Sequence, residues 1–130
     1  MGKKKKVQPD YNASIKETSY TRIYSDMLTC ETYKDLSIGL RQFYICCRAQ
    51  ASSKIGRQCL YNHAAETGIP YSYEKYFVFP AEHLRKYGYK PSNTVKYFKA
   101  LEAAGFIEIV EKNQHNHRVN VYAFTSKWKS

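Results

Sequence analysis

The fold of this chain is decided by residues 79–122, which read FPAEHLRKYGYKPSNTVKYFKALEAAGFIEIVEKNQHNHRVNVY. Apolar residues recur at helical spacing in the first half of this stretch, and two runs rich in β-branched residues follow in the second half. The pattern predicts a short helix, a turn, a longer helix, and then two strands joined by a polar and basic loop. A mixed α+β fold is therefore expected for this part of the chain.

The longer helix is predicted to run between Pro91 and Gly105, over about fourteen residues. Proline tolerates the first helical turn, Ser92 can cap free backbone amides, and Gly105 can adopt the left-handed conformation that ends a helix. Residues that gather on one side at helical spacing are expected to face the core: Thr94, Val95, Phe98 and Leu101. Residues expected on the outward side or beside it are Ser92, Asn93, Lys96, Tyr97, Lys99 and Ala100.

A shorter helix is expected just upstream, and its inner edge is marked by Ala81, Leu84 and Tyr87. It should end at Gly88, and Tyr89 should follow as an apolar plug before the longer helix begins. Such a tight joint fixes the angle at which two helices cross. Downstream, residues 106–111 and 119–124 are expected to form paired strands, with residues 112–118 as the loop between them.

This pattern resembles the winged helix-turn-helix DNA-binding domains of bacterial regulators and of plasmid and phage replication proteins. Their motif is a glycine, an apolar residue, a polar turn, Thr-Val, a leucine, small residues, a second glycine and an apolar strand. The matching residues are Gly88, Tyr89, Thr94, Val95, Leu101, Ala103, Ala104, Gly105, Phe106 and Ile107. The match covers about a third of the chain, and its turn is about one residue longer than usual, with Lys90 where a capping serine is common. The first residue of the longer helix therefore stays open.

A weaker similarity covers residues 20–50, which look like the opening of the N-terminal domains of replication-initiator A proteins. An aromatic-rich strand at residues 20–24 and a helical turn at residues 25–28 would precede a buried helix capped by Ser37. Together, the resemblances imply an α+β winged helix-turn-helix with an extra helical insertion before the first core strand and a C-terminal β-hairpin wing.

Two helices are predicted between these regions. The helix after Ser37 should be the centre of the core, because it is apolar over much of its surface through Ile38, Leu40, Arg41, Phe43, Tyr44, Ile45, Cys46 and Cys47. The next helix should cover residues 53–67 and end at Gly68, with an apolar face of Ile55, Cys59, Leu60 and Ala64. A strand should follow at residues 76–79. The insertion at residues 51–76 either extends the core or forms a dimer contact.

The resemblance implies binding of double-stranded DNA, as a regulatory, replication or transfer accessory factor of a bacterial mobile element. In such domains the second helix enters the major groove, and here Asn93 would pair with adenine and Lys96 with guanine. The residues expected to enter the groove are Ser92, Asn93, Lys96, Tyr97 and Ala100. Lys90 and Lys99 would hold phosphates beside the helix. Further backbone contacts are expected from the wing residues Lys112, Asn113, Gln114, His115, Asn116, His117 and Arg118.

The composition agrees with a polyanionic partner. The 130 residues carry a formal net charge of +10 and the sequence pI is about 9.4. One domain is expected over residues 16–130, after a flexible basic arm at residues 1–15 that would add phosphate contacts through Lys3, Lys4, Lys5 and Lys6. No stretch is apolar enough for a membrane span or a signal-peptide core, so we expect a cytoplasmic protein with no membrane partner.

Other functions have less support in the sequence. The 4 cysteines include no CxxC pair, so reduced, buried thiols are expected rather than a metal site, although Cys59 and His63 are spaced i, i+4 and His115 and His117 could chelate. No catalytic motif, cofactor or small-molecule substrate is indicated, and we do not expect an enzyme. Binding of single-stranded DNA or RNA through the tyrosines, a protein-interaction module on the same scaffold, and a homodimer stay open.

Overall fold

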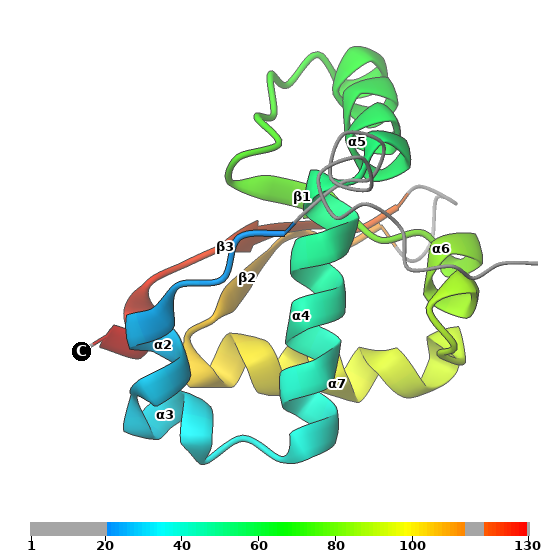
Figure 1. Cartoon of the computed structure of the whole chain (residues 1–130). Coiled ribbons are helices and arrows are strands. Elements are labelled where there is room, and N and C mark those ends of the chain that lie inside the picture. Colours follow the sequence, from blue (N-terminus) through cyan, green and yellow to red (C-terminus); the bar gives the residue numbers. More distant parts are fainter. Residues whose placement is uncertain (1–20, 114–118, 130) are drawn as a thin grey trace, which may run out of the picture.

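The computed structural model describes residues 21–113 and 119–129, and in these ranges the chain has the mixed α+β composition expected from its sequence. Six α-helices surround a small sheet of three antiparallel strands in the described ranges (Figure 1). The expected basic arm at residues 1–15 lies outside them. Within the described part of the chain, no helix combines the length and the apolar character that crossing a membrane would need.

The first described elements are two short helices, α2 (Ser25–Thr29) and α3 (Glu31–Lys34). The helical turn expected at residues 25–28 is confirmed. The strand expected at residues 20–24 is wrong for its described part, because residues 21–24 pair with none of the described strands. Side chains with a high β propensity do not make a strand without a neighbour to pair with. This segment lies beside a helix instead, with Thr21 Oγ1 3.4 Å from Ser52 Oγ.

Helix α4 (Ile38–Ser52) forms the centre of the core, as predicted. It begins where Ser37 Oγ accepts a hydrogen bond from the Leu40 amide at 3.1 Å, which confirms the predicted cap. Its Phe43 is fully buried, and its ring contacts the rings of Phe79, Tyr89, Tyr97 and Phe98. Ile38 is 81% exposed because it belongs to the first turn, before the helix reaches the core.

Helix α5 (Lys54–Thr67) is the predicted insertion, and Gly68 ends it with a φ of 75°. The predicted apolar face is only partly correct: Leu60 is buried, but Ile55 is 50% exposed. The buried face of α5 includes Gly56 and His63 instead, because the backbone of α5 comes close to that of α4 at Gly56. Leu60 packs in a second cluster with Tyr71, Val78 and Val121, so the insertion extends the core.

The sheet has the order β1-β3-β2, with β1 (Tyr76–Val78), β2 (Ile107–Glu111) and β3 (Val121–Phe124). The three strands lie within the predicted ranges, each shorter than expected, and the pairing expected between β2 and β3 is confirmed. Phe77 and Tyr122 face each other on the side of the main core, while Val78 and Val121 face each other on the side of α5. Figure 1 shows the sheet between α5 and the last helix, α7 (Pro91–Ala104).

Helices α6 (Ala81–Lys86) and α7 form the predicted pair, and Gly88 and Gly105 follow them with φ values of 93° and 90°. The predicted cap is wrong, since α7 begins at Pro91 and its N-cap residue is Lys90. Proline occupies the first helical position, so the next residue, Ser92, lies too far along the helix to cap it. In α6 only Leu84 is buried, and Ala81, expected on the inner edge, is exposed.

Candidate functional site

Helix α7 carries one buried face along its whole length. Thr94, Phe98 and Leu101 are buried, as predicted, and the Phe98 ring stacks on that of Tyr122 with centroids 4.1 Å apart. The prediction for Val95 is wrong, because this side chain is 49% exposed. Successive helical residues are rotated by about 100°, so Val95 lies at the margin of the apolar stripe, where the neighbouring strands do not cover it.

The opposite face of α7 is polar and largely bare. Ser92, Asn93, Lys96 and Lys99 are exposed and Ala100 is half-buried. Tyr97 is half-buried beside this face, and its ring packs on those of Phe43 and Tyr89 at centroid distances of 5.3 and 6.2 Å. Tyr97 therefore closes one border of this face, and Lys96 Nζ lies 5.6 Å from the Tyr97 ring centroid.

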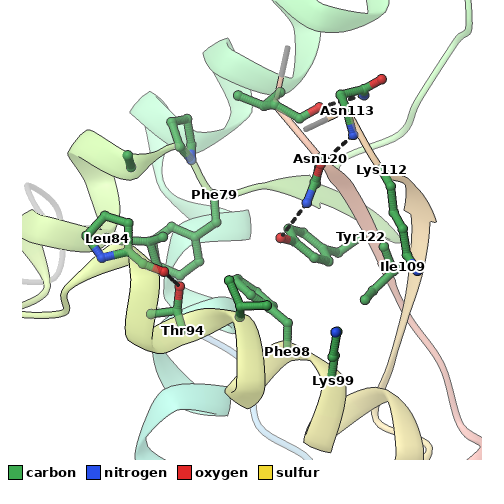
Figure 2. A pocket seen from close by; sticks show the side chains of 15 residues that line it. Phe79, Leu84, Thr94, Phe98, Lys99, Ile109, Lys112, Asn113, Asn120 and Tyr122 are labelled. Carbon is green, nitrogen blue, oxygen red and sulfur yellow. Dashed lines mark hydrogen bonds between the residues drawn. The ribbon is translucent and has the colours of Figure 1, made fainter. Parts of the chain in front are cut away.

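A groove of about 640 Å³ lies between α7 and the β2–β3 pair, and we call it the α7 groove (Figure 2). Its apolar lining comes from the main core and from the edge of α7. The residues that line it are Phe79, Pro80, Ala81, Leu84, Pro91, Thr94, Val95, Phe98, Lys99, Ile109, Lys112, Asn113, Val119, Asn120 and Tyr122. Among these described residues, the charged ones are both lysines.

Lys99 and Lys112 come from different elements and line the same groove. In Figure 2 the Lys99 side chain points from α7 towards the β2–β3 pair, from which Lys112 extends. Within residues 21–113 and 119–129, carboxylates form ion pairs only with Lys34 and His63, so neither groove lysine is neutralised by one. Their positive charge is therefore available to a ligand.

The one acidic residue of α7 is bound to strand β2. Glu102 Oε2 accepts a hydrogen bond from the Ile109 amide at 2.9 Å, so its carboxylate is bound to the outer edge of β2. At the other end of α7 the first turn contains no acidic residue, and Lys90 makes no side-chain cap. Uncapped amides and the helix dipole make such an N-terminus favourable to anions. The electrostatics of α7 thus favour a negatively charged partner.

Some polar side chains that line the groove form hydrogen bonds within the protein. Asn120 Nδ2 lies 3.5 Å from the Tyr122 hydroxyl, and burial raises the pKa of Tyr122 to about 12 although that hydrogen bond opposes the shift. The backbone amide of Asn113 donates a hydrogen bond to Asn120 Oδ1 at 2.7 Å, and the side-chain Nδ2 of Asn113 donates to the Val119 carbonyl at 2.8 Å. Asn113 therefore fastens the two strands to each other where their regular pairing ends.

The other residues predicted to contact DNA lie partly inside and partly outside the ranges that the structure describes. Lys90 is exposed at the start of α7, close in sequence to the bare face. The predicted wing residues Gln114, His115, Asn116, His117 and Arg118 lie outside the described residues, as do the lysines at positions 3–6. The structure thus brings together Lys99, Lys112 and Asn113 from the predicted set around one groove.

The cysteines are free thiols, and Cys46 and Cys47 are buried. In the part of the chain that the structure describes, no group of three or more His, Cys, Asp or Glu residues could hold a metal ion. The i, i+4 pair on α5 does not converge, because Cys59 Sγ lies 3.9 Å from His83 Nε2 whereas His63 contacts Glu111.

Sequence reasoning missed a hydrogen-bonded cluster beside the groove, centred on Glu111. Its carboxylate accepts hydrogen bonds from the Tyr71 hydroxyl, from Asn113 Nδ2 at 3.0 Å and from His63 Nε2 at 3.2 Å. Burial by itself raises the pKa of Glu111, but these hydrogen bonds and the proximity of His63 outweigh it and hold the pKa below its usual value. Burial, followed by the bond to Glu111, raises the pKa of Tyr71. His63 and Tyr71 lie 48 and 40 residues from Glu111 along the chain, so no local pattern signals these contacts.

Acidification should destabilise the wild-type protein more than the Glu111→Gln variant. The pKa of Glu111 is lower in the folded state than its unfolded value of about 4.3. The stabilisation of the fold by the ionised carboxylate is therefore complete when the pH is above the unfolded pKa. This stabilisation is lost as the pH falls through the lower, folded-state pKa. Urea unfolding at neutral and acid pH measures the loss, with the exposed Glu108→Gln as the control. Equal acid losses in wild type and Glu111→Gln would contradict the expectation.

Comparison of the chain with protein-family models, with curated proteins and with solved structures found no match.

Proposed function

We propose that this protein binds double-stranded DNA, with α7 as the reading helix of a winged helix-turn-helix and the β2–β3 pair as the base of its wing. The observation that carries the proposal is the α7 groove, in which two lysines line a space beside the bare polar face of a helix. Neither lysine pairs with a carboxylate of residues 21–113 or 119–129. Lys99 belongs to α7, and Lys112 directly follows β2. A sugar-phosphate backbone between the two elements would be neutralised from both sides.

The dimensions and side chains of α7 suit the major groove. Its 14 residues span about 21 Å, and a B-DNA major groove admits a helix whose N-terminal residues contact base edges. Asn93 and Lys96 lie exposed in the first half of the helix, where Asn93 would read adenine and Lys96 guanine. The uncapped N-terminus and Lys90 would add phosphate contacts. Specificity would then depend on Asn93 and Lys96, and affinity on the surrounding lysines.

Single-stranded nucleic acid is less favoured by the same geometry. Binding of single strands uses aromatic rings whose faces are free to stack on bases. Of the three tyrosines interleaved with lysines in the sequence, Tyr89 and Tyr97 pack on Phe43 and on each other. The third, Tyr87, is 37% exposed and packs edge-on against Phe79. A role as an accessory or regulatory factor of a bacterial mobile element remains part of the proposal and follows from the sequence resemblance alone.

A protein-interaction module is the second candidate, and one observation favours it. Val95 is 49% exposed in a groove whose floor includes Phe79, Leu84 and Phe98, and an apolar floor also suits a peptide side chain. Chemical-shift mapping with a duplex separates the two candidates. Shifts along α7 support DNA binding, whereas an unperturbed α7 would favour the module.

Duplex affinity should fall steeply with salt concentration. Three phosphate contacts, from Lys90, Lys99 and Lys112, predict a slope of about −2.7 for log K against log[salt], or a loss of roughly 40-fold between 50 and 200 mM. Fluorescence anisotropy with a mixed-sequence duplex measures this slope, and selection from a randomised duplex pool then gives the preferred site. Binding that is indifferent to salt, or no binding at low salt, would overturn the proposal.

A further inference from the structure

The Glu111 cluster joins three parts of the chain, and it contacts the α7 groove only through Asn113, which lines the groove. His63 belongs to α5 and is only 4% exposed, and its ring stacks on that of Tyr71 with centroids 6.2 Å apart. Tyr71 is 8% exposed and belongs to the segment between α5 and β1. Both donate to one carboxylate, at the last residue of β2. The insertion is thus tied to the last residue of β2, which directly precedes Lys112.

A β-bulge gives Glu111 its direction. Ile109 is paired with Tyr122, and Glu111 rather than Val110 is paired with Val121, so one extra residue is inserted into β2. Paired residues of an antiparallel sheet have side chains on the same face, and a bulge re-aims the side chain that follows it. Regular alternation would place Glu111 on the Ile109 side of the sheet. The bulge places it with Val121, on the face that α5 covers.

Glu111 also binds Asn113, two residues further along the chain. Its Oε1 accepts from Asn113 Nδ2, and the same Asn113 holds Val119 and Asn120 across the end of the pair. Lys112 lies between these two fastened residues. On one side of Lys112, Glu111 is held by His63 and Tyr71, and on the other side Asn113 is bound to Glu111 by one hydrogen bond.

We propose that Glu111 is a positioning residue, through which His63 and Tyr71 of the inserted segment fix the direction in which Lys112 enters the α7 groove. The consequence for DNA rests on the proposed function. The placement of Lys112 by Glu111 is a property of the free protein and does not depend on the proposed function. This gives the insertion a task beyond extending the core.

Charge alone predicts the opposite effect of removing Glu111. An acidic residue next to a phosphate-binding lysine repels the backbone, so on charge alone Glu111→Gln would strengthen DNA binding. If Glu111 positions Lys112, the same substitution should weaken binding, because the lysine contact is lost. Glu108→Gln is the matched control, since it removes the same charge from an exposed residue of the same strand.

The first experiment measures duplex affinity and its salt slope. Glu111→Gln should weaken binding about 5- to 10-fold near 100 mM salt and flatten the slope by about 0.9, as expected for one lost phosphate contact. Glu108→Gln should keep the slope and not weaken binding. In a Lys112→Ala background, Glu111→Gln should cause no further loss, because both changes remove one interaction. Stronger binding by Glu111→Gln, or losses that multiply in the double variant, would overturn the inference.

The second experiment needs no DNA. In the free protein, Glu111→Gln should shift the NMR signals of Lys112, of the Asn113 side-chain amide and of Asn120, while those of α4 stay in place. Tyr71→Phe removes a single hydroxyl and serves if Glu111→Gln fails to fold; its expected shifts are smaller and at the same residues. Unchanged signals at these residues in the folded variant would overturn the inference. Failure of wild type to bind duplex would overturn the proposed function instead, and the NMR result would still decide the inference.

Discussion

Replacement of Gly56 by alanine is expected to lower the free energy of unfolding by about 3 kcal/mol or more. A Cβ atom at this position would lie 1.8 Å from the Gln50 carbonyl oxygen and 2.9 Å from Ser53 Oγ. The first of these atoms is backbone, so no rotamer change can relieve the clash. Helices α4 and α5 would have to separate at their junction, which would also pull Leu60 and His63 from the sheet.

Gly39 provides the matched control for this experiment. It lies in the first turn of α4, and a Cβ atom there would meet nothing within 4 Å. Gly39→Ala should therefore raise the free energy of unfolding by roughly 0.5–1 kcal/mol, because alanine loses less backbone entropy in a helix. Urea unfolding followed by circular dichroism measures both variants. Similar stabilities for Gly56→Ala and wild type would show that the two helices do not approach as closely as described.

Reversal of both groove charges is expected to reduce duplex affinity by more than about 100-fold at 100 mM salt. Lys99→Glu and Lys112→Glu each remove one phosphate contact, worth roughly 8-fold at this salt concentration, and each adds repulsion. Both side chains line the groove and are exposed, so the fold should tolerate the change. Binding isotherms and a thermal unfolding curve, measured on the same sample, separate lost contacts from lost structure.

The control is the Lys54→Glu, Lys75→Glu double variant, which has the same net charge. Both lysines are exposed, and neither lines the α7 groove. If the groove is the site, the control should retain most of the affinity, losing only the long-range contribution of net charge. Equal losses in the two double variants would mean that binding follows total charge and has no preferred face.

Three helix ends were predictable because their signals are local, whereas the cap predicted at the start of α7 was wrong. Gly68 and Gly105 stand at the ends of α5 and α7 with positive φ, as the sequence indicated, and Ser37 caps α4. These residues act on backbone atoms within one turn, so neighbouring sequence contains the whole interaction. The order of elements from α6 to β3 followed in the same way, from the change of apolar period along the chain.

The margins of apolar faces were not predictable in this way. Val95 and Ile55 belong to apolar stripes by spacing, yet both are half exposed, because a stripe does not reveal how far the neighbouring element extends over it. The uncovered Val95 is one of the residues that line the α7 groove. Glu111 illustrates a second limit of sequence reasoning. A bulge determines on which side of the sheet its side chain lies, whereas regular alternation along β2 would predict the other side.

The bond between Glu102 and the Ile109 amide has a consequence for self-association. Strand β2 lies at one border of the sheet, where unpaired amides invite a strand from another molecule and so begin aggregation. At Ile109 the outward amide is already occupied by the carboxylate, and the bulge at the next residue interrupts the flat edge that such a strand would need. The opposite border, β1, is only 3 residues long. A concentrated solution of this protein is thereby protected against growth of the sheet from one molecule into the next.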